Sequence, residues 1–269
     1  MALNPGDVAG TLALDVVPWP AVPAPAVAVV MPLGSTEQHG HHLPFDTDTA
    51  VAAELARRLV DARPGLVLAP PLAYGASGEH EGFPGTLSMG CEALERVLLE
   101  LGRSASRWAA RLLVVNGHGG NLAPLDAAVR RLRSEGRETA YWTPQVPGGD
   151  SHAGRTETSL MLALRPAAVR REVAVTGPTA PLQELLPRIR AVNLAAVSPS
   201  GVLGDPAGAS VEEGRDLLAL LLDDLDRAVG RWLAGEDVDE GGRLTGWRAG
   251  VRAAVAQVSR SGSEAEPDA

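Results

Sequence analysis

Residues 34–51 gather the side chains best suited to chemistry. The segment holds three of the six histidines in the chain together with three carboxylates. They are His39, His41, His42, Glu37, Asp46 and Asp48. Imidazole nitrogens and carboxylate oxygens in combination suit divalent metal ions. We therefore expect this segment to supply part of a metal site.

The spacing inside this segment strengthens that expectation. Glu37 and His39 are two residues apart, so in extended backbone their side chains point to the same side. Asp48 follows at the start of an expected helix. The alternative interpretation is that the three histidines are solvated loop residues and that the carboxylates cap the helix, whose N-terminus Thr47 or Asp48 could cap. Glu-x-His together with an aspartate, flanked by two glycines, favours the metal site.

A second candidate lies in residues 116–121, Asn-Gly-His-Gly-Gly-Asn, where His118 follows a buried strand. The carboxyl ends of parallel strands meet at one edge of a sheet, so His118 should lie near Glu37. Glycines also let the backbone approach a ligand closely. The alternative is a glycine-rich turn whose histidine only forms a hydrogen bond.

A third candidate, in residues 152–158, follows another expected strand. Glu157 could supply a carboxylate and His152 could act as a proton donor. Alone the pair is weak evidence, because a glutamate at a helix start also interacts favourably with the helix dipole. The pair becomes evidence for a metal site only in combination with the other two clusters.

Residues 72–88 form a long glycine-rich loop, and long loops in compact domains are usually functional. We expect Tyr74, Ser77, Glu79 and His80 to contact the substrate. Glu79 and His80 could instead be metal ligands or neighbours of ligands. Plain loop structure is the alternative.

Apolar runs and helical periodicity predict the elements that must position these residues. Strands are expected at 26–33, 66–69, 111–116 and 139–143, and helices at 48–61, 92–110, 123–133, 157–164 and 210–233. Leu94, Val97, Leu98 and Leu101 should form the buried face of the helix over 92–110. The alternation of strand and helix predicts one α/β domain with a mostly parallel sheet.

The flanking segments are expected to carry less structure. Residues 1–25 read as an irregular lead-in, 26–233 as the domain, and 234–269 as an extension with a weak helix near 247–258 and a disordered tail. Residues 166–207 should be irregular cover with short elements.

Composition excludes several function classes. The net charge is −9 and every basic residue is arginine, so nucleic acid is not expected as a partner and no lysine Schiff base is available. No stretch reaches the roughly 20 apolar residues that span a membrane, and no signal peptide is expected. The single cysteine, Cys91, fits a reducing cytoplasm.

Four motifs occur in a specific order: residues 34–40 (Gly-Ser-Thr-Glu-Gln-His-Gly), His42-Leu-Pro with Thr47-Asp48, residues 116–121, and His152-Ala-Gly with Glu157-Thr-Ser. Together they resemble the creatininase family of binuclear metal amidohydrolases, over roughly residues 26–232. The resemblance implies a three-layer α/β/α domain that hydrolyses an amide bond and forms closed homo-oligomers.

The resemblance also implies the ligands. Glu37, Asp48 and His118 would bind one divalent ion, while His39 and the bridging Asp48 would bind a second. The ions expected are Fe²⁺ or Zn²⁺, with Mn²⁺ also found in relatives. Nitrogen and oxygen ligands alone do not choose among them.

Creatininase itself has a further glutamate two residues after the strand-end histidine, where this chain has Gly120. Glu157 is the expected replacement, as in relatives that share the glycine pair. The difference argues against creatinine as the substrate.

Residues 73–80, 147–150 and 201–206 are most similar to family members that process a short ribosomal precursor peptide. The implied substrate is that modified peptide, with its C-terminal Val-Tyr pair already crosslinked and decarboxylated. A metal-activated water would release the modified dipeptide, and His152 would protonate the departing nitrogen. Two alternatives stay open: another amidohydrolase, acting on a cyclic amide or a formamide, and a non-catalytic metal-binding subunit.

Overall fold

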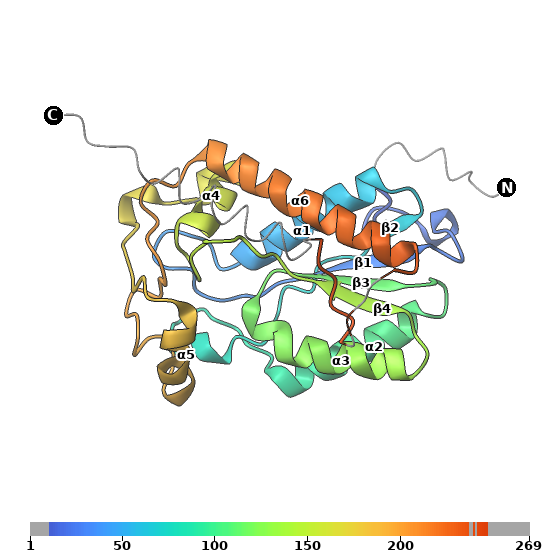
Figure 1. The fold of residues 1–269 in the computed structure, drawn as a ribbon, viewed down its shortest axis with the longest axis horizontal. Helices are drawn as coiled ribbons and strands as arrows, with labels where there is room; N and C mark the ends of the chain where they lie inside the picture. The colour runs from blue at the N-terminus through green and yellow to red at the C-terminus, as the bar shows by residue number, and fades with distance from the viewer. Residues whose placement is uncertain (1–10, 237–238, 240, 247–269) are drawn as a thin grey trace.

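A four-stranded parallel sheet forms the centre of the molecule. The computed structural model describes residues 11–236, 239 and 241–246 (Figure 1). The strands are β1 (Ala28–Leu33), β2 (Leu66–Leu68), β3 (Leu112–Asn116) and β4 (Thr139–Trp142), in the order β2-β1-β3-β4. Every neighbouring pair is parallel. The α/β prediction is confirmed, and each strand begins and ends within two residues of its predicted bounds.

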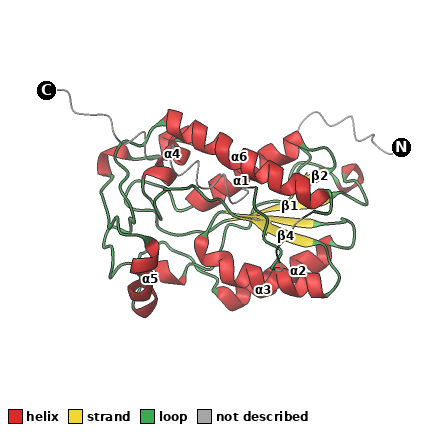
Figure 2. Ribbon diagram, viewed as in Figure 1, coloured by secondary structure: helices red, strands yellow, loops and turns green. Residues whose placement is uncertain are grey.

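Helices cover both faces of this sheet and make three layers (Figures 1 and 2). Three helices pack on one face: α1 (Thr47–Ala62), α4 (Arg155–Leu164) and α6 (Val211–Leu233). Two pack on the other: α2 (Cys91–Ala105) and α3 (Leu122–Ser134). Successive strand residues alternate between the two cores, as the pleat of a strand requires. In β3, Leu113 faces α1 and α6, whereas Val114 faces α2 and α3.

The predicted buried face of α2 is wrong at one position. Leu94 and Leu98 are buried as expected, but Leu101 is 41% exposed. The contact with α3 explains the difference: a Cβ added at Gly102 would lie 2.4 Å from Leu132 Cδ1, so the two helices approach at the glycine. The buried stripe therefore runs through Leu94, Leu98 and Gly102, and Leu101 points away.

The cover over 166–207 contains one helix that sequence patterning missed, α5 (Leu182–Ala191). Pro187 lies inside it and only Ile189 is buried, so the segment lacks both the composition and the apolar stripe of a typical helix. The cover over 166–207 also holds two short 3-10 turns, Pro166–Ala168 and Arg171–Val173, and three more lie elsewhere in the chain: Trp19–Ala21, Gly78–His80 and Gly119–Asn121.

The outer edge of β4 is covered by residues 242–244. The Tyr141 N–H donates to the Gly242 carbonyl at 3.0 Å, and the Leu244 N–H donates to the Tyr141 carbonyl at 2.7 Å. An exposed strand edge is thereby shortened. The helix predicted near 247–258 and the disordered tail lie outside the described residues. Among the described helices, none is long and apolar enough to cross a membrane.

Two leucines of α2 test this packing. Leu98→Ala should lower the free energy of unfolding by about 2–5 kcal/mol, because Leu98 is 2% exposed and its removal leaves a cavity. Leu101→Ala should change it by less than about 1 kcal/mol. Urea unfolding of both variants measures the difference, and equal destabilisation would contradict the arrangement.

Candidate metal centre

The carboxyl edge of the sheet gathers the candidate residues of all the sequence clusters. Glu37 and His39 follow β1, and His118 follows β3 by two residues. His152 and Glu157 come from the loop after β4 and the first turn of α4. This edge is where parallel α/β sheets bind their ligands.

Asp48 lies in the first turn of α1 and is buried. Its carboxylate accepts a hydrogen bond from Ser35 Oγ at 2.7 Å, and it lies 3.1 Å from His39 Nε2 and 3.2 Å from His118 Nδ1. The alternative that Thr47 or Asp48 caps the helix is wrong: both are inside it, and Asp46 at the N-cap position makes no side-chain cap bond. Burial favours the neutral acid, but His39 and His118 hold the pKa of Asp48 well below its usual range.

Glu37 is fully buried, and neither carboxylate oxygen has a hydrogen-bond partner among the described residues. His118 Nε2 lies 3.1 Å from Oε2, in a geometry that makes no hydrogen bond. Burial raises the pKa of Glu37 to about 7. A buried carboxylate without donors is costly unless an opposite charge accompanies it. The residues present therefore fit a bound cation.

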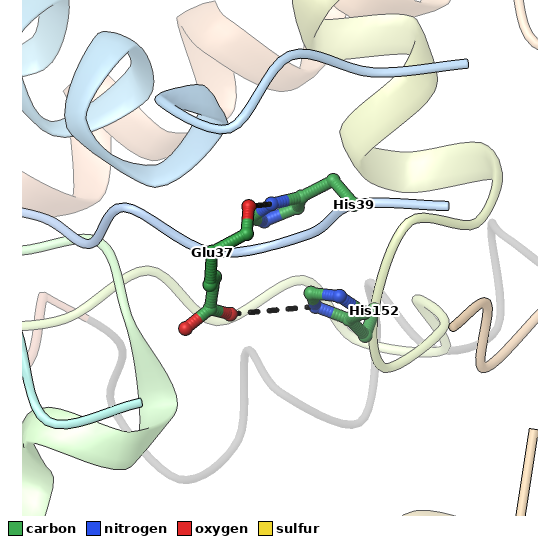
Figure 3. Close-up of side chains that lie close together, drawn as sticks. All are labelled: Glu37, His39 and His152. Carbon is green, nitrogen blue, oxygen red and sulfur yellow. Dashed lines mark hydrogen bonds and ion pairs between the residues drawn. The ribbon is translucent and has the colours of Figure 1, made fainter. Parts of the chain in front are cut away.

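His39 is oriented by the backbone of its own loop (Figure 3). Its Nδ1 lies within hydrogen-bond distance of the Glu37 carbonyl, at 3.1 Å. Nε2 is left facing Asp48 at 3.1 Å and Glu157 at 3.9 Å. A carbonyl that orients one imidazole nitrogen, while the other nitrogen faces further candidate ligands, is the usual arrangement of a metal-binding histidine.

Three overlapping sets of side chains could hold an ion among the described residues. Two share Asp48: Glu37, Asp48 and His118, and His39, Asp48 and Glu157. These are the two sets that the motif resemblance implies. The third is Glu37, His39 and His152. All three bring ligand atoms within 4.8 Å of one another.

His152 is aimed at the centre by a strained turn. Ala153 has φ of 52°, the one positive value for a non-glycine among the described residues. The Ala153 N–H donates to Glu157 Oε2 at 2.6 Å, so the same turn also holds Glu157. His152 Nδ1 then lies 3.9 Å from Glu37 Oε1 (Figure 3). Strained backbone of this kind is characteristic of functional sites.

The polar residues of the loop over residues 72–88 lie at different distances from the centre. His80 is buried with Nε2 3.2 Å from Glu37 Oε1, and Ser77 Oγ lies 3.5 Å from His118 Nε2. Glu79 is partly exposed, 3.9 Å from His118 Nε2. Tyr74 is 49% exposed and has no described contact with the centre.

Gly120 has no room for a side chain. A Cβ there would lie 2.3 Å from the Ala76 carbonyl oxygen, 2.4 Å from His118 Nε2 and 2.7 Å from Glu79 Oε1. The neighbouring loop thus fills the space that a carboxylate side chain at this position would need. The two other loop histidines lie apart: His41 is exposed, and His42 Nε2 bonds Thr158 Oγ1 at 2.9 Å.

Sequence patterning missed two groups that hold the loops together. Asn121 Oδ1 accepts from the Ala76 N–H at 2.8 Å, and its Nδ2 donates to the Gly34 carbonyl at 3.0 Å. It thereby ties the loops after β1 and β3 to the 72–88 loop. Gln38 bonds two of the histidines. The bracketing asparagines were visible in the sequence, but amide side chains carry no distinctive spacing.

Comparison with known proteins identifies the family of this chain. Residues 18–229 match the family model described as creatininase, creatinine amidohydrolase. The mycofactocin precursor peptide peptidase of Mycolicibacterium smegmatis is 52% identical over 81% of this chain and 88% of its own length. The protein of the same name from Mycobacterium ulcerans is 51% identical over 80% and 90%.

Solved structures extend the likeness to the fold. A crystal structure of creatinine amidohydrolase superposes with a TM-score of 0.69 at 27% identity, covering 83% of this chain and 98% of that one. Creatininase structures with similar scores, 0.66 and 0.65, are described as a Zn–Zn type and as a manganese form. The family match, the relatives and the shared fold agree, and the chain belongs to the creatininase family.

Proposed function

We propose that this chain is a metal-dependent peptidase that releases the modified C-terminal Val-Tyr dipeptide from the mycofactocin precursor peptide. The observation that carries the proposal is a buried carboxylate and imidazole centre in a chain about half identical to peptidases of that name. Creatinine is disfavoured as substrate because Gly120 leaves no room for the carboxylate that creatininase carries there.

Glu37, Asp48 and His118 would hold one divalent ion, and His39, Asp48 and Glu157 would hold the other, so that both sets would share Asp48. Fe²⁺ or Zn²⁺ is the proposed occupant, with Mn²⁺ as the alternative. When bound, such ions polarise the scissile carbonyl and lower the pKa of a water toward neutrality. The chain's own part is to fix the ligands, exclude water and move the proton.

His152 is the group proposed to move that proton. Burial, together with His39 and His80, lowers its pKa well below the usual value, so His152 is neutral at pH 7. Its Nε2 lies 2.9 Å from the Gln38 carbonyl and Nδ1 faces Glu37. A neutral imidazole first accepts the proton of the attacking water and then donates it to the departing nitrogen. His152 would thus act first as a general base and then as a general acid. The motif resemblance predicts only the second of these roles.

Ser77, Glu79, His80 and Tyr74 are proposed to contact the peptide. Glu79 and His80 border the centre, so they would contact the part of the peptide near the scissile bond. The Tyr74 ring is half exposed, so it would contact a part of the peptide farther from the centre. A homo-oligomer and a cytoplasmic location also stay predictions. The presence of His152 beside the implied ligands argues against a non-catalytic metal-binding subunit.

The first test is a cleavage assay. Metal-loaded protein should release the dipeptide from the modified precursor peptide, read by mass spectrometry, and should leave creatinine and a formamide intact. His152→Ala should slow release by about 10²–10⁴-fold, the usual contribution of a positioned proton-transfer group. No dipeptide release with any of the three metals would contradict the assignment.

The second test counts metal ions. Glu157→Gln should lower the bound metal from two ions per subunit toward one, because only the set containing Glu157 is weakened. Asp46→Asn is the matched control: Asp46 is two residues from Asp48 but pairs with Arg165 on the surface. Elemental analysis after dialysis gives the ratio, and two retained ions in the Glu157 variant would argue against its role.

The third test measures the protons that the protein releases when it binds metal. Burial would lower the pKa of both His39 and His118, but Asp48 and Glu37 raise them to about 10 and about 9 in the metal-free protein. Both are protonated at pH 7, and a metal binds only neutral imidazole, so binding must release protons. The affinity should therefore rise with pH until about 9 to 10.

Calorimetry of Zn²⁺ binding in buffers of different ionisation enthalpy measures this release. It should be about three protons per subunit at pH 7, about two from His39 and His118 and about half a proton each from Glu37 and Glu157, whose pKa values burial raises to about 7. The release should fall as the pH approaches 9. The exposed His41 provides a control, since His41→Gln should leave the release unchanged. Binding at pH 7 without proton release would contradict the histidine assignments.

A further inference from the structure

Gln38 lies between two implied ligands, Glu37 and His39, yet its side chain turns away from both. It is 5% exposed and reaches across the centre to two other loops. Its Nε2 lies 3.0 Å from His80 Nδ1, 3.1 Å from His152 Nε2 and 3.2 Å from the Gly201 carbonyl. No step proposed above uses this amide.

One contact fixes which way the amide faces. The Gly40 N–H donates to Gln38 Oε1 at 2.8 Å, so this atom must be the oxygen and Nε2 must be the donor. Gly201 makes room for the arrangement: it has φ of 78°, and a Cβ there would collide with the same amide. The segment 201–206 thus serves, in part, to admit the Gln38 side chain.

The two amide hydrogens of Gln38 have two acceptors, His80 Nδ1 and the Gly201 carbonyl. The hydrogen bond to His80 determines which nitrogen of that ring carries the proton. If Nε2 donates to His80 Nδ1, that nitrogen carries no proton, and the neutral ring bears its proton on Nε2. His80 Nε2 lies 3.2 Å from Glu37 Oε1. The N–H edge of His80 then faces the carboxylate, and its lone pair faces away from the metal ligands.

The second hydrogen decides the state of His152. When it donates to the Gly201 carbonyl, His152 Nε2–H is free to donate to the Gln38 carbonyl at 2.9 Å, and the Gly201 carbonyl, the Gln38 carbonyl and His152 Nε2 all have partners. When it donates to His152 instead, the lone pair of Nε2 faces the Gln38 carbonyl oxygen at the same 2.9 Å, and the Gly201 carbonyl loses its donor. Buried polar groups strongly favour the satisfied network.

We propose that Gln38 is a positioning residue that sets the tautomers of His80 and His152, presenting the N–H of His80 and the unprotonated Nδ1 of His152 to the centre. The proton-transfer consequence rests on the function proposed above; the tautomers themselves do not. With Nδ1 of His152 unprotonated and 3.9 Å from Glu37 Oε1, the ring is ready to accept a proton at the start of the cycle.

The direct test is ¹⁵N NMR of histidine-labelled, Zn²⁺-loaded protein without substrate, which distinguishes protonated from unprotonated ring nitrogens. Six histidines give few signals, assignable by single substitutions. We expect His80 protonated at Nε2 and His152 protonated at Nε2. Either ring protonated at Nδ1 alone would overturn the proposal, and this needs no variant that has to fold.

Gln38→Glu should then change His80 specifically. One carboxylate oxygen can still accept from Gly40, but the other has no hydrogen to donate, so His80 Nδ1 must gain a proton. The same substitution at the exposed Gln183 of α5 is the matched control and should leave all six histidines unchanged. An unchanged His80 Nδ1 in the Gln38 variant would contradict the proposal.

A kinetic readout separates positioning from mere folding. Gln38→Glu should lower kcat for dipeptide release by at least about 10-fold while KM changes less than about threefold, because proton transfer and not peptide binding is affected. A change confined to KM would overturn the catalytic half of the proposal. If the tautomers are as stated but no peptide is cleaved, the proposed function fails and the Gln38 assignment stands.

Discussion

The carboxylate of Glu37 is fully buried, neither of its oxygens makes a hydrogen bond within the described part of the chain, and the rest of the centre is arranged around that fact. Asp48 lies close by and is held ionised by its histidines. Buried charges persist only when paired or bound to a metal. Without metal, the protonated His39 and His118 supply the compensating charge. Under the proposed function, bound ions would replace those protons, so the centre would exchange protons for cations.

The fold delivers this arrangement by pressing the start of α1 against two strand ends. A Cβ at Gly34 would lie 2.4 Å from Thr49 Cα, and one at Gly117 would lie 2.4 Å from the Asp48 carbonyl oxygen. These two glycines follow β1 and β3, so the first turn of α1 sits directly on the sheet edge. Asp48 consequently reaches both His39 and His118, which come from different loops. The glycines of the two motifs are thus as necessary as the ligands.

Much of this could be predicted from sequence, since the strands are apolar runs and chain order places their carboxyl ends together. That logic predicts that His118 and Glu157 lie near Glu37, and the motif resemblance adds Asp48 as a shared ligand. The prediction fails where a contact decides the outcome: the pattern predicts a buried Leu101, but Gly102 is the residue that packs against α3. The sequence does not predict helix α5, because a proline inside a helix is unfavourable and only Ile189 of this helix is buried. The role of Gln38 could not be predicted, because it depends on Gly40 and Gly201 meeting one amide.

The central proposal is that two ions would bind between the loops that follow β1, β3 and β4 and would share Asp48 as a ligand. Anomalous diffraction from crystals of the metal-loaded protein, recorded at the absorption edge of the bound metal, tests it most directly. The account predicts two peaks, one beside Glu37 and His118 and one beside His39 and Glu157, with Asp48 contacting both. A single peak held by Glu37, His39 and His152, with Asp48 bound to no metal, would contradict it.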